Sequence, residues 1–335
     1  MSFPEHYSRF LIAERPNDII TPETFCFETV PFSLQPGKGE VLVQTQYLSI
    51  DPAQRLLLNA DRAYREPLEL GTVMTAIGLG VVREVGESVS LVPGDIVSGN
   101  LGWTEYIVFE EKGLQKIDVP QGAQVLDFLG PLGHIGITAV IGLLDYGQLK
   151  LGETVLVSGA AGAVGTIVCQ LAKARGAKVY AIAGSAEKCA YLEKEAGVHK
   201  ALNYKAPNFK EEFSTIETFD IFFDNVGGEI LNLALTKMNL HARIIICGAI
   251  SGYNGQETPP LTTYRSLLPK RARIQAFSLM DEAARFSSAL QVLIGEFQKG
   301  TLRQKYHILE GLPSAPKALD MLFTGESNGK LIVKL

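Results

Sequence analysis

The sequence has few cysteines, and they do not cluster. Among 335 residues there are four, Cys26, Cys169, Cys189 and Cys247, and no two form a C-x-x-C pair. So sparse a set excludes the disulfide framework of a small secreted protein. It also supplies no cysteine cluster for a tetrahedral zinc site. We therefore expect four reduced thiols, a cytoplasmic protein and no metal site.

Long apolar runs and an excess of basic residues are also missing. No apolar run approaches the ~20 residues of a membrane helix, and the N-terminus lacks the apolar core of a signal peptide. Lys and Arg number 31 against 36 Asp and Glu, which gives a net charge of −5. Binding to nucleic acid usually requires a basic excess or patch. We expect neither a membrane nor a nucleic acid as partner.

What is present is the composition of a folded protein, with 46% hydrophobic and 20% charged residues. The length favours two domains, because one hydrophobic core stops growing near roughly 250–300 residues. The first ~120 residues are rich in short strand patterns bounded by Gly, Pro and Asp. Strands are predicted at 41–47, 80–85 and 103–108, with a turn at 93–95 leading into another strand.

From about residue 125 the pattern changes to strands that alternate with helices. Such alternation predicts a parallel, doubly wound sheet. A last strand is predicted at 331–333, and its pattern is like that of the first domain. We therefore expect the C-terminal segment to belong to the first domain. The predicted strands are 154–158, 178–183, 220–223 and 243–247, and the predicted helices are 164–173, 186–196, 229–238 and 283–298.

A glycine-rich segment lies between the strand at 154–158 and the helix that follows it. Glycine allows a close approach of the backbone to a diphosphate, and a helix N-terminus offers unpaired N–H groups. Against the template G-x-G-x-x-G, Ala160 occupies the first glycine position, and Gly162 and Gly165 the others. A plain structural turn is the alternative, but the strand–loop–helix context favours a dinucleotide site.

The end of the second strand indicates which dinucleotide binds. An enzyme that uses NAD carries an acid there for the ribose 2′-hydroxyl. Here Gly184 and Ser185 occupy that place, and Lys188 follows in the next helix. The two small residues leave room for a phosphate that the lysine neutralises. Lys188 as a solvated surface lysine is the alternative; the missing acid favours NADPH.

These segments together resemble one enzyme family, the zinc-independent medium-chain dehydrogenases/reductases. The similarity is greatest to the double-bond reductases, which include prostaglandin/leukotriene reductase, plant alkenal reductase and bacterial curcumin reductase. It runs nearly end to end. The shared blocks are 47–52, 102–103, 142–144, 160–165, 184–185, 187–188, 203–205, 223–228 and 247–254.

The resemblance implies an α/β fold in which a GroES-like, β-rich substrate domain carries an inserted Rossmann domain. We expect the first domain at 1–124 and 300–335 and the second at 125–299. A homodimer is common in the family. The residues that the resemblance and the motifs assign to NADPH/NADP+ are Thr138, Gly162, Ala163, Val164, Gly165, Gly184, Ser185, Lys188, Tyr204, Asn225, Cys247, Gly248, Ala249, Ile250, Tyr253, Phe277, Leu279 and Asn328.

The implied reaction is NADPH-dependent reduction of the C=C bond of an α,β-unsaturated aldehyde or ketone, without a metal. Hydride goes to the β-carbon, a donor stabilises the enolate, and the α-carbon is protonated. Quinone reduction is the alternative within enzymes, and a non-catalytic NADPH-binding protein of the same fold is the alternative outside them.

The sequence departs from the family at several positions near the substrate. Ala53 replaces the tyrosine of the usual Asp-Pro-Tyr-Met-Arg block, and that tyrosine is a candidate enolate donor. Tyr264 and His134 are then the candidate catalytic residues, with a surface tyrosine and a structural histidine as the alternatives. An ion pair between Asp51 and Arg55 is the structural alternative for Arg55. The predicted substrate-binding residues are Tyr47, Ala53, Arg55 and Tyr264.

Overall fold

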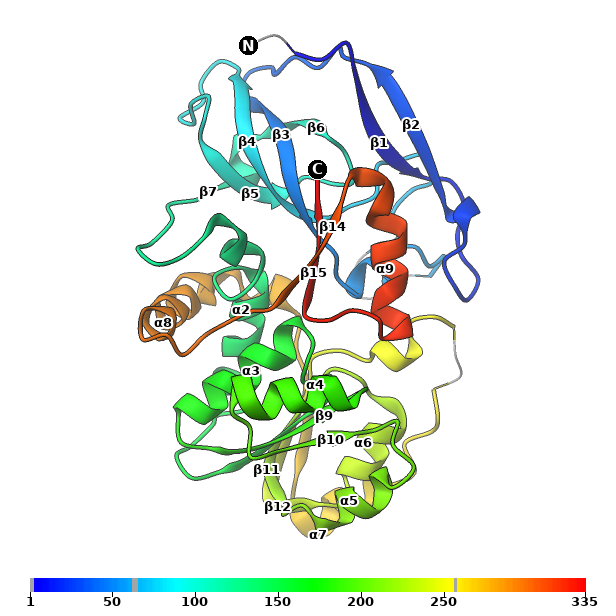
Figure 1. Ribbon diagram of the computed structural model, residues 1–335, viewed down its shortest axis with the longest axis vertical. Coiled ribbons are helices and arrows are strands. Elements are labelled where there is room, and N and C mark those ends of the chain that lie inside the picture. The colour runs from blue at the N-terminus through cyan, green and yellow to red at the C-terminus, as the bar shows by residue number, and fades with distance from the viewer. Residues whose placement is uncertain (1–2, 62–65, 256–257) are drawn as a thin grey trace. The chain divides into compact units, whose positions relative to one another are not determined.

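We analysed the protein as a computed structural model that describes residues 3–61, 66–255 and 258–335. The chain divides into two compact units, Met1–Leu129 with Tyr306–Leu335 and Gly130–Lys305 (Figure 1). The breaks come slightly later than the expected 124/125 and 299/300. The reason is that a short 3-10 helix, Val125–Leu129, packs on the first unit's sheet. In the same unit, the Tyr306 hydroxyl donates to Asp127 at 2.8 Å.

The first unit is built mainly from antiparallel strands. Its larger sheet has the order β14-β15-β3-β4-β5-β7, with β6 also paired to β3, and β1 and β2 form a separate ribbon. The C-terminal strand joins this sheet, with Ile332 opposite Ser49. The strands are β1 (His6–Ile12), β2 (Phe25–Pro31), β3 (Glu40–Ser49), β4 (Ile77–Val85), β5 (Ile96–Asn100), β6 (Tyr106–Glu110), β7 (Gln115–Lys116), β14 (Tyr306–Glu310) and β15 (Lys330–Lys334); the helices are α1 (Ala53–Leu56) and α9 (Ala315–Thr324).

The buried Trp103 belongs to one hydrophobic core of this unit. Its ring packs against Phe10 and Phe25, with ring centroids 5.9 and 4.8 Å away. The predicted strand 103–108 is wrong at its start, since β6 begins only at Tyr106. The Trp103 N–H instead donates to the Met74 carbonyl at 2.7 Å, and the Trp103 carbonyl accepts the Phe10 N–H at 2.9 Å.

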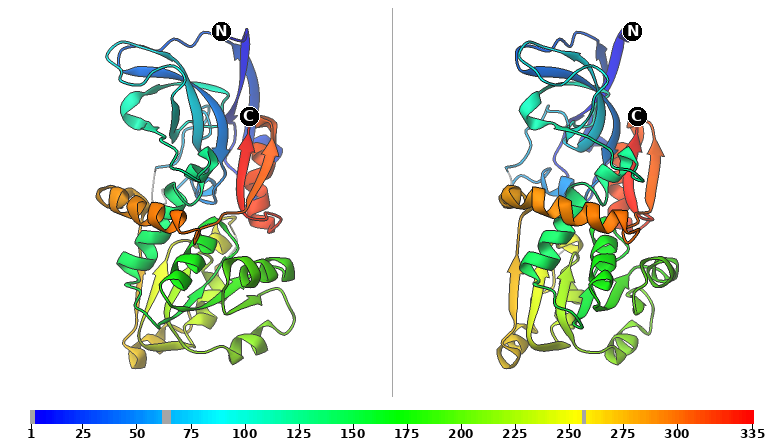
Figure 2. Two further views of the ribbon diagram at one scale, coloured as in Figure 1. Left: turned by 60° about the vertical axis from the view of Figure 1, so that its left-hand side comes forward. Right: turned by 90° about the vertical axis from the view of Figure 1, so that its left-hand side faces the viewer.

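The second unit has one parallel sheet, with the order β10-β9-β8-β11-β12-β13. The order reverses between β8 and β11, and helices cover both faces (Figures 1 and 2). This arrangement confirms the predicted doubly wound domain. The strands are β8 (Thr154–Val157), β9 (Lys178–Ala183), β10 (Lys200–Asn203), β11 (Phe219–Asp224), β12 (Met238–Ile246) and β13 (Arg273–Ala276); the helices are α2 (His134–Val140), α3 (Ala163–Ala174), α4 (Ala186–Tyr191), α5 (Phe209–Thr215), α6 (Gly228–Ala234), α7 (Leu267–Lys270) and α8 (Phe286–Gln298).

Three helix boundaries differ from the prediction. The helix expected at 186–196 is α-helical only to Tyr191 and continues as a π-helix over Leu192–Ala196. The helix expected at 229–238 ends at Ala234, because the chain turns and Met238 pairs with Phe219 at the start of β12. The helix expected from 283 begins at Phe286, because Glu282 has non-helical backbone angles and a 3-10 segment precedes α8. Within the described ranges, no helix is both long and apolar enough to cross a membrane.

Candidate functional site

The predicted cofactor residues of the second unit lie at one edge of its sheet. All six parallel strands end there, and nearly every one of these residues follows such a strand end directly. Ligands of open α/β sheets bind at this edge, beside the point where the strand order reverses. Gly162 to Gly165 follow β8, Gly184 to Lys188 follow β9, Tyr204 follows β10, Asn225 follows β11, Cys247 to Tyr253 follow β12, and Phe277 and Leu279 follow β13.

The glycine-rich turn after β8 forms a tight entry into α3. Gly162 is the N-cap of that helix, and the N–H of Ala160 donates to the carbonyl of Ile182 at 3.0 Å. A Cβ on Gly165 would lie 2.4 Å from the carbonyl oxygen of Gly159 and 2.7 Å from Cα of Ala160. Only glycine therefore permits this packing of helix against turn. The result is a helix N-terminus whose first N–H groups fit a diphosphate.

A buried polar network joins the ends of β8 and β11 next to this turn. The Ser158 hydroxyl donates to Asp224 Oδ1 at 2.6 Å, and Asn225 Nδ2 donates to the Ser158 carbonyl at 2.7 Å. Burial raises the pKa of Asp224, while hydrogen bonds from Ser158 and from the backbone of Val226 and Gly227 act in the opposite direction. The network fixes the backbone of Asn225, a predicted cofactor residue.

Two lysines, Lys188 and Lys205, lie near the end of β9. The Ser185 hydroxyl accepts the Lys188 N–H at 3.2 Å and so caps α4. From the end of β10, the Tyr204 ring lies over Gly184, where an added Cβ would be 3.1 Å from Cε1. Burial lowers the pKa of Lys188, and the positive charge of Lys205 acts in the same direction. An anion placed here relieves the repulsion between the two lysines.

The loop after β12 is fixed by its own hydrogen bonds. The N–H groups of Cys247 and Gly248 donate to the Asp224 carbonyl at 2.8 and 3.1 Å. The Ala249 N–H donates to the Tyr253 hydroxyl at 3.1 Å, which folds that side chain back over the loop. Burial raises the pKa of Cys247 to about 12. Its thiol is therefore protonated near neutral pH and is a poor nucleophile.

Phe277 is supported from the long segment that begins with α2. Its ring stacks on Tyr146 with centroids 5.1 Å apart, and a Cβ on Gly142 would lie 2.9 Å from Phe277 Cζ. The Tyr146 hydroxyl donates to the buried Glu282, in the 3-10 segment that begins at Leu279. The Phe277–Leu279 segment is thus held on both sides.

The two candidate proton donors have different surroundings. His134 is half-buried and is the first residue of α2, a helix that packs against α3 and α8. Its carbonyl accepts the Thr138 hydroxyl at 2.7 Å, so that hydroxyl is committed to its own helix. Tyr264 begins a short 3-10 helix and is 57% exposed.

Four predicted residues belong to the first unit, and their surroundings there differ. Tyr47 in β3 and Ala53 at the start of α1 are half-buried, and the Asn328 N–H donates to His307 Nδ1 at 3.3 Å. Arg55 is fully buried and donates to Asn59 Oδ1 at 2.5 Å and to the Asp18 carbonyl at 2.8 Å. These contacts favour a structural role for Arg55.

The Asp51 carboxylate has a partner that the sequence analysis did not anticipate. This half-buried carboxylate accepts a hydrogen bond at 2.6 Å from Lys330, which is buried. This ion pair joins the segment after β3 to the first residue of β15.

Three residues near the cofactor edge were also missed. Ser158, Asp224 and Lys205 all lie within or beside predicted elements. A polar residue at the end of an otherwise apolar parallel strand is the signal that reveals the first two, because such a position faces the ligand edge. Lys205 had no comparable signal.

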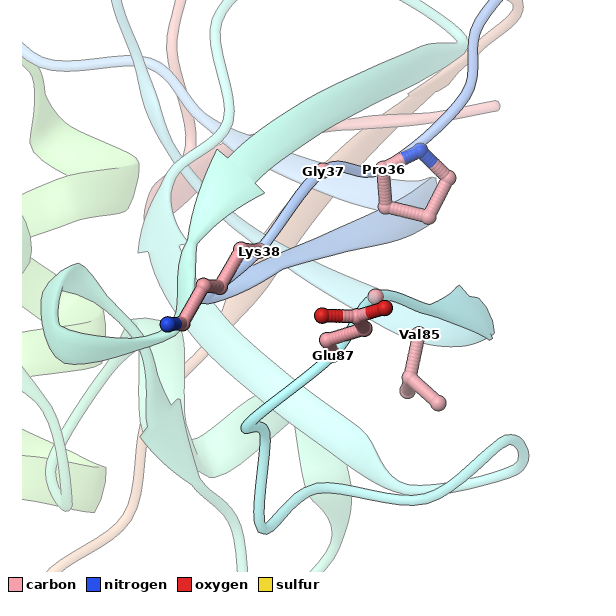
Figure 3. Close-up of a pocket in the computed structure, with 6 residues that line it drawn as sticks. Pro36, Gly37, Lys38, Val85 and Glu87 are labelled. Carbon is pink, nitrogen blue, oxygen red and sulfur yellow. The ribbon is translucent and has the colours of Figure 1, made fainter.

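A hollow of about 440 Å3 lies elsewhere, on the first unit, between the turn before β3 and the end of β4 (Figure 3). Pro36 and Lys38 line it on one side and Val85 and Glu87 on the other. None of the predicted site residues lines it.

Comparison with known proteins identifies the family. Residues 8–117 match the N-terminal domain of oxidoreductase, and residues 163–294 match zinc-binding dehydrogenase. The chain is 41% identical to YfmJ of Bacillus subtilis, over 97% of this chain and 96% of that one. It is 35% identical to the NADPH-dependent curcumin reductase of Escherichia coli, over 98% and 96%.

The chain belongs to the double-bond reductase branch of the medium-chain dehydrogenases/reductases.

A solved structure extends the likeness to three dimensions. CurA of Vibrio vulnificus, crystallised in complex with NADPH, superposes with a TM-score of 0.91 at 31% identity, over 98% of both chains. The predicted family and its combination of a GroES-like and a Rossmann domain are therefore confirmed. Although one matched family is described as zinc-binding, the described ranges of this chain contain no group of three or more His, Cys, Asp or Glu suited to a metal ion.

Proposed function

We propose that the protein reduces the C=C bond of α,β-unsaturated aldehydes or ketones with NADPH. One observation of the structure carries the cofactor assignment. Lys188, Tyr204 and Lys205 converge at the end of β9, where an NAD enzyme carries an acid. A ribose 2′-phosphate is the part of NADPH that matches this charge. The family relationship supports the reaction class.

Most residues of the site bind and orient the cofactor. The N-terminus of α3 holds the diphosphate, and the group of Lys188 and Tyr204 holds the 2′-phosphate. Asn225, the loop from Cys247 to Tyr253 and the segment after β13 line the rest of the cofactor. When bound, NADPH supplies the hydride that is added to the β-carbon. An acid of the protein, or water, delivers the proton that completes the reduced carbonyl compound.

The function is tested by following NADPH consumption with a panel of enals and enones, beside a panel of quinones and a titration of NADPH alone. The proposal expects turnover with enals or enones. Turnover confined to quinones would make the protein a quinone reductase. NADPH binding without turnover on either panel would make it a non-catalytic binding protein.

The proton donor is tested by two substitutions. We expect His134→Ala to lower kcat by at least about tenfold, because a positioned acid contributes roughly 10²–10⁴-fold. NADPH affinity should not change.

Tyr264→Phe is the parallel test, since it removes one hydroxyl and little else. An unchanged kcat in His134→Ala would return His134 to a structural role. If both variants are fully active, then no donor from these two residues is needed and water suffices.

Metal removal should have no effect on turnover. We expect dialysis against a strong chelator to leave kcat and KM unchanged and elemental analysis to find no stoichiometric zinc. A tightly bound zinc ion whose removal abolishes activity and whose return restores it would contradict this assignment.

A homodimer in the cytoplasm is the assembly that we propose. The edge strand β13 is paired only to β12 among the described elements. Exposed apolar side chains flank it in sequence, at Leu268 and Met280. An unpaired edge with such neighbours is a surface that proteins normally cover. Sedimentation velocity should give twice the mass of 36.4 kDa, and the monomer mass would overturn the proposal.

A further inference from the structure

The backbone of the segment Asn203–Lys205 is held by strand pairing and by a side-chain hydrogen bond. β10 lies beside β9 in parallel register, with Asn203 opposite Ala183. The Tyr204 N–H donates to the Ala183 carbonyl at 3.0 Å, which extends the pairing one residue beyond the strand. Asn203 Oδ1 then accepts the Lys205 N–H at 3.1 Å, which turns the chain. The backbone of Lys205 is therefore fixed at the edge of the site.

Tyr204 carries the side chain of Lys205 toward the same place. The Tyr204 ring lies over Gly184, where any side chain would meet it, and Lys205 Nζ lies 5.9 Å from the centroid of that ring. An ammonium at this distance is attracted to the aromatic face. Lys205 is exposed, so burial does not hold its side chain in place. The contact with the Tyr204 ring is what positions its ammonium group.

The charges around this group favour an anion between the two lysines. Lys205 is close enough to Lys188 to disfavour its charged form. The carboxylate of Glu187 favours the charged form of Lys188, and it also lies 4.0 Å from Lys305 Nζ. A dianionic phosphate ester placed between Lys188 and Lys205 interacts favourably with both.

We propose that Lys205, seated on the Tyr204 ring, is a further specificity-determining residue that contacts the 2′-phosphate of NADPH opposite Lys188. The inference rests on the proposed NADPH-dependent function. Lys205 then contributes part of the preference for NADPH over NADH, and this contribution depends on the Tyr204 ring that positions the lysine.

The test measures dissociation constants for NADPH and NADH with purified protein. Lys205→Ala should weaken NADPH binding roughly threefold to tenfold, since the lysine is exposed and its contribution is screened. NADH binding should stay unchanged, and Lys205→Arg should retain most of the affinity. Lys210→Ala, an exposed lysine in the first turn of α5, is the matched control and should alter neither constant.

A double-mutant cycle tests the role of the Tyr204 ring. In a Tyr204→Ala background, Lys205→Ala should have little further effect, because the ring that positions the charge is gone. An equally large effect in both backgrounds would overturn the role of Tyr204. Loss of selectivity in Lys188→Ala but not in Lys205→Ala would overturn this inference and leave the proposed function intact. If neither variant alters selectivity, the NADPH assignment itself fails.

Discussion

Gly165→Ala is expected to weaken NADPH binding by roughly 5–150-fold, with a matching rise in KM. The added Cβ would lie 2.4 Å from the Gly159 carbonyl oxygen and 2.7 Å from Cα of Ala160. Both contacts are backbone atoms, so no side-chain rotation relieves them. The turn must move away from the N-terminus of α3, and overpacking of this kind costs about 1–3 kcal/mol. Fluorescence titration of NADPH measures the effect.

The matched control is the same substitution in an open helix. A Cβ on Gly295 in α8 would have no neighbour within 4 Å, so Gly295→Ala should leave NADPH binding unchanged. It should also raise the melting temperature slightly, because alanine is the better helix former. If Gly165→Ala binds NADPH as tightly as the wild type, the turn after β8 does not hold the diphosphate.

Lys188→Ala is expected to raise the KM for NADPH about tenfold to a hundredfold while leaving that for NADH nearly unchanged. Only NADPH carries the 2′-phosphate, and a charge-assisted contact to it is worth roughly 1.5–3 kcal/mol. Lys188 is half-buried, which reduces screening by solvent. Steady-state kinetics with each cofactor provide the comparison.

Lys194→Ala serves as the control for Lys188, since it is an exposed lysine further along the same helical segment. It should change neither KM. Equal losses for NADPH and NADH in Lys188→Ala would mean that the lysine supports the fold of α4 or the diphosphate site. The 2′-phosphate assignment would then be withdrawn.

Much of the fold follows from local patterns in the sequence. Apolar runs such as the one at β8 are buried on both faces, and glycines end the neighbouring elements. The alternation of strands with helices and the glycines between them therefore suffice to predict the parallel sheet. The ligand edge follows from that sheet. The glycine-rich turn and Lys188 were predicted from their place after a strand, whereas Tyr204, Asn225 and the residues after β12 and β13 were predicted from the family resemblance. Apart from Thr138, all of them follow the end of a strand.

The failures arose where distant contacts decide the local structure. Trp103 leaves its predicted strand because Phe10 and Phe25 are adjacent to it only in the folded unit. One partner of the Asp51 carboxylate, Lys330, was not predicted, and it lies near the other end of the chain. Lys205 Nζ lies near the ring of Tyr204, and that ring lies over Gly184, which follows the neighbouring strand β9. No spacing within one segment encodes such pairs.

The most direct test of the central claim follows the hydride itself. The protein is given NADPH deuterated at C4 of the nicotinamide and a simple aryl enone, and the product is analysed by NMR. The account predicts a saturated ketone with deuterium at the β-carbon and the carbonyl intact. Deuterium on a newly formed carbinol carbon, with the C=C bond retained, would contradict it.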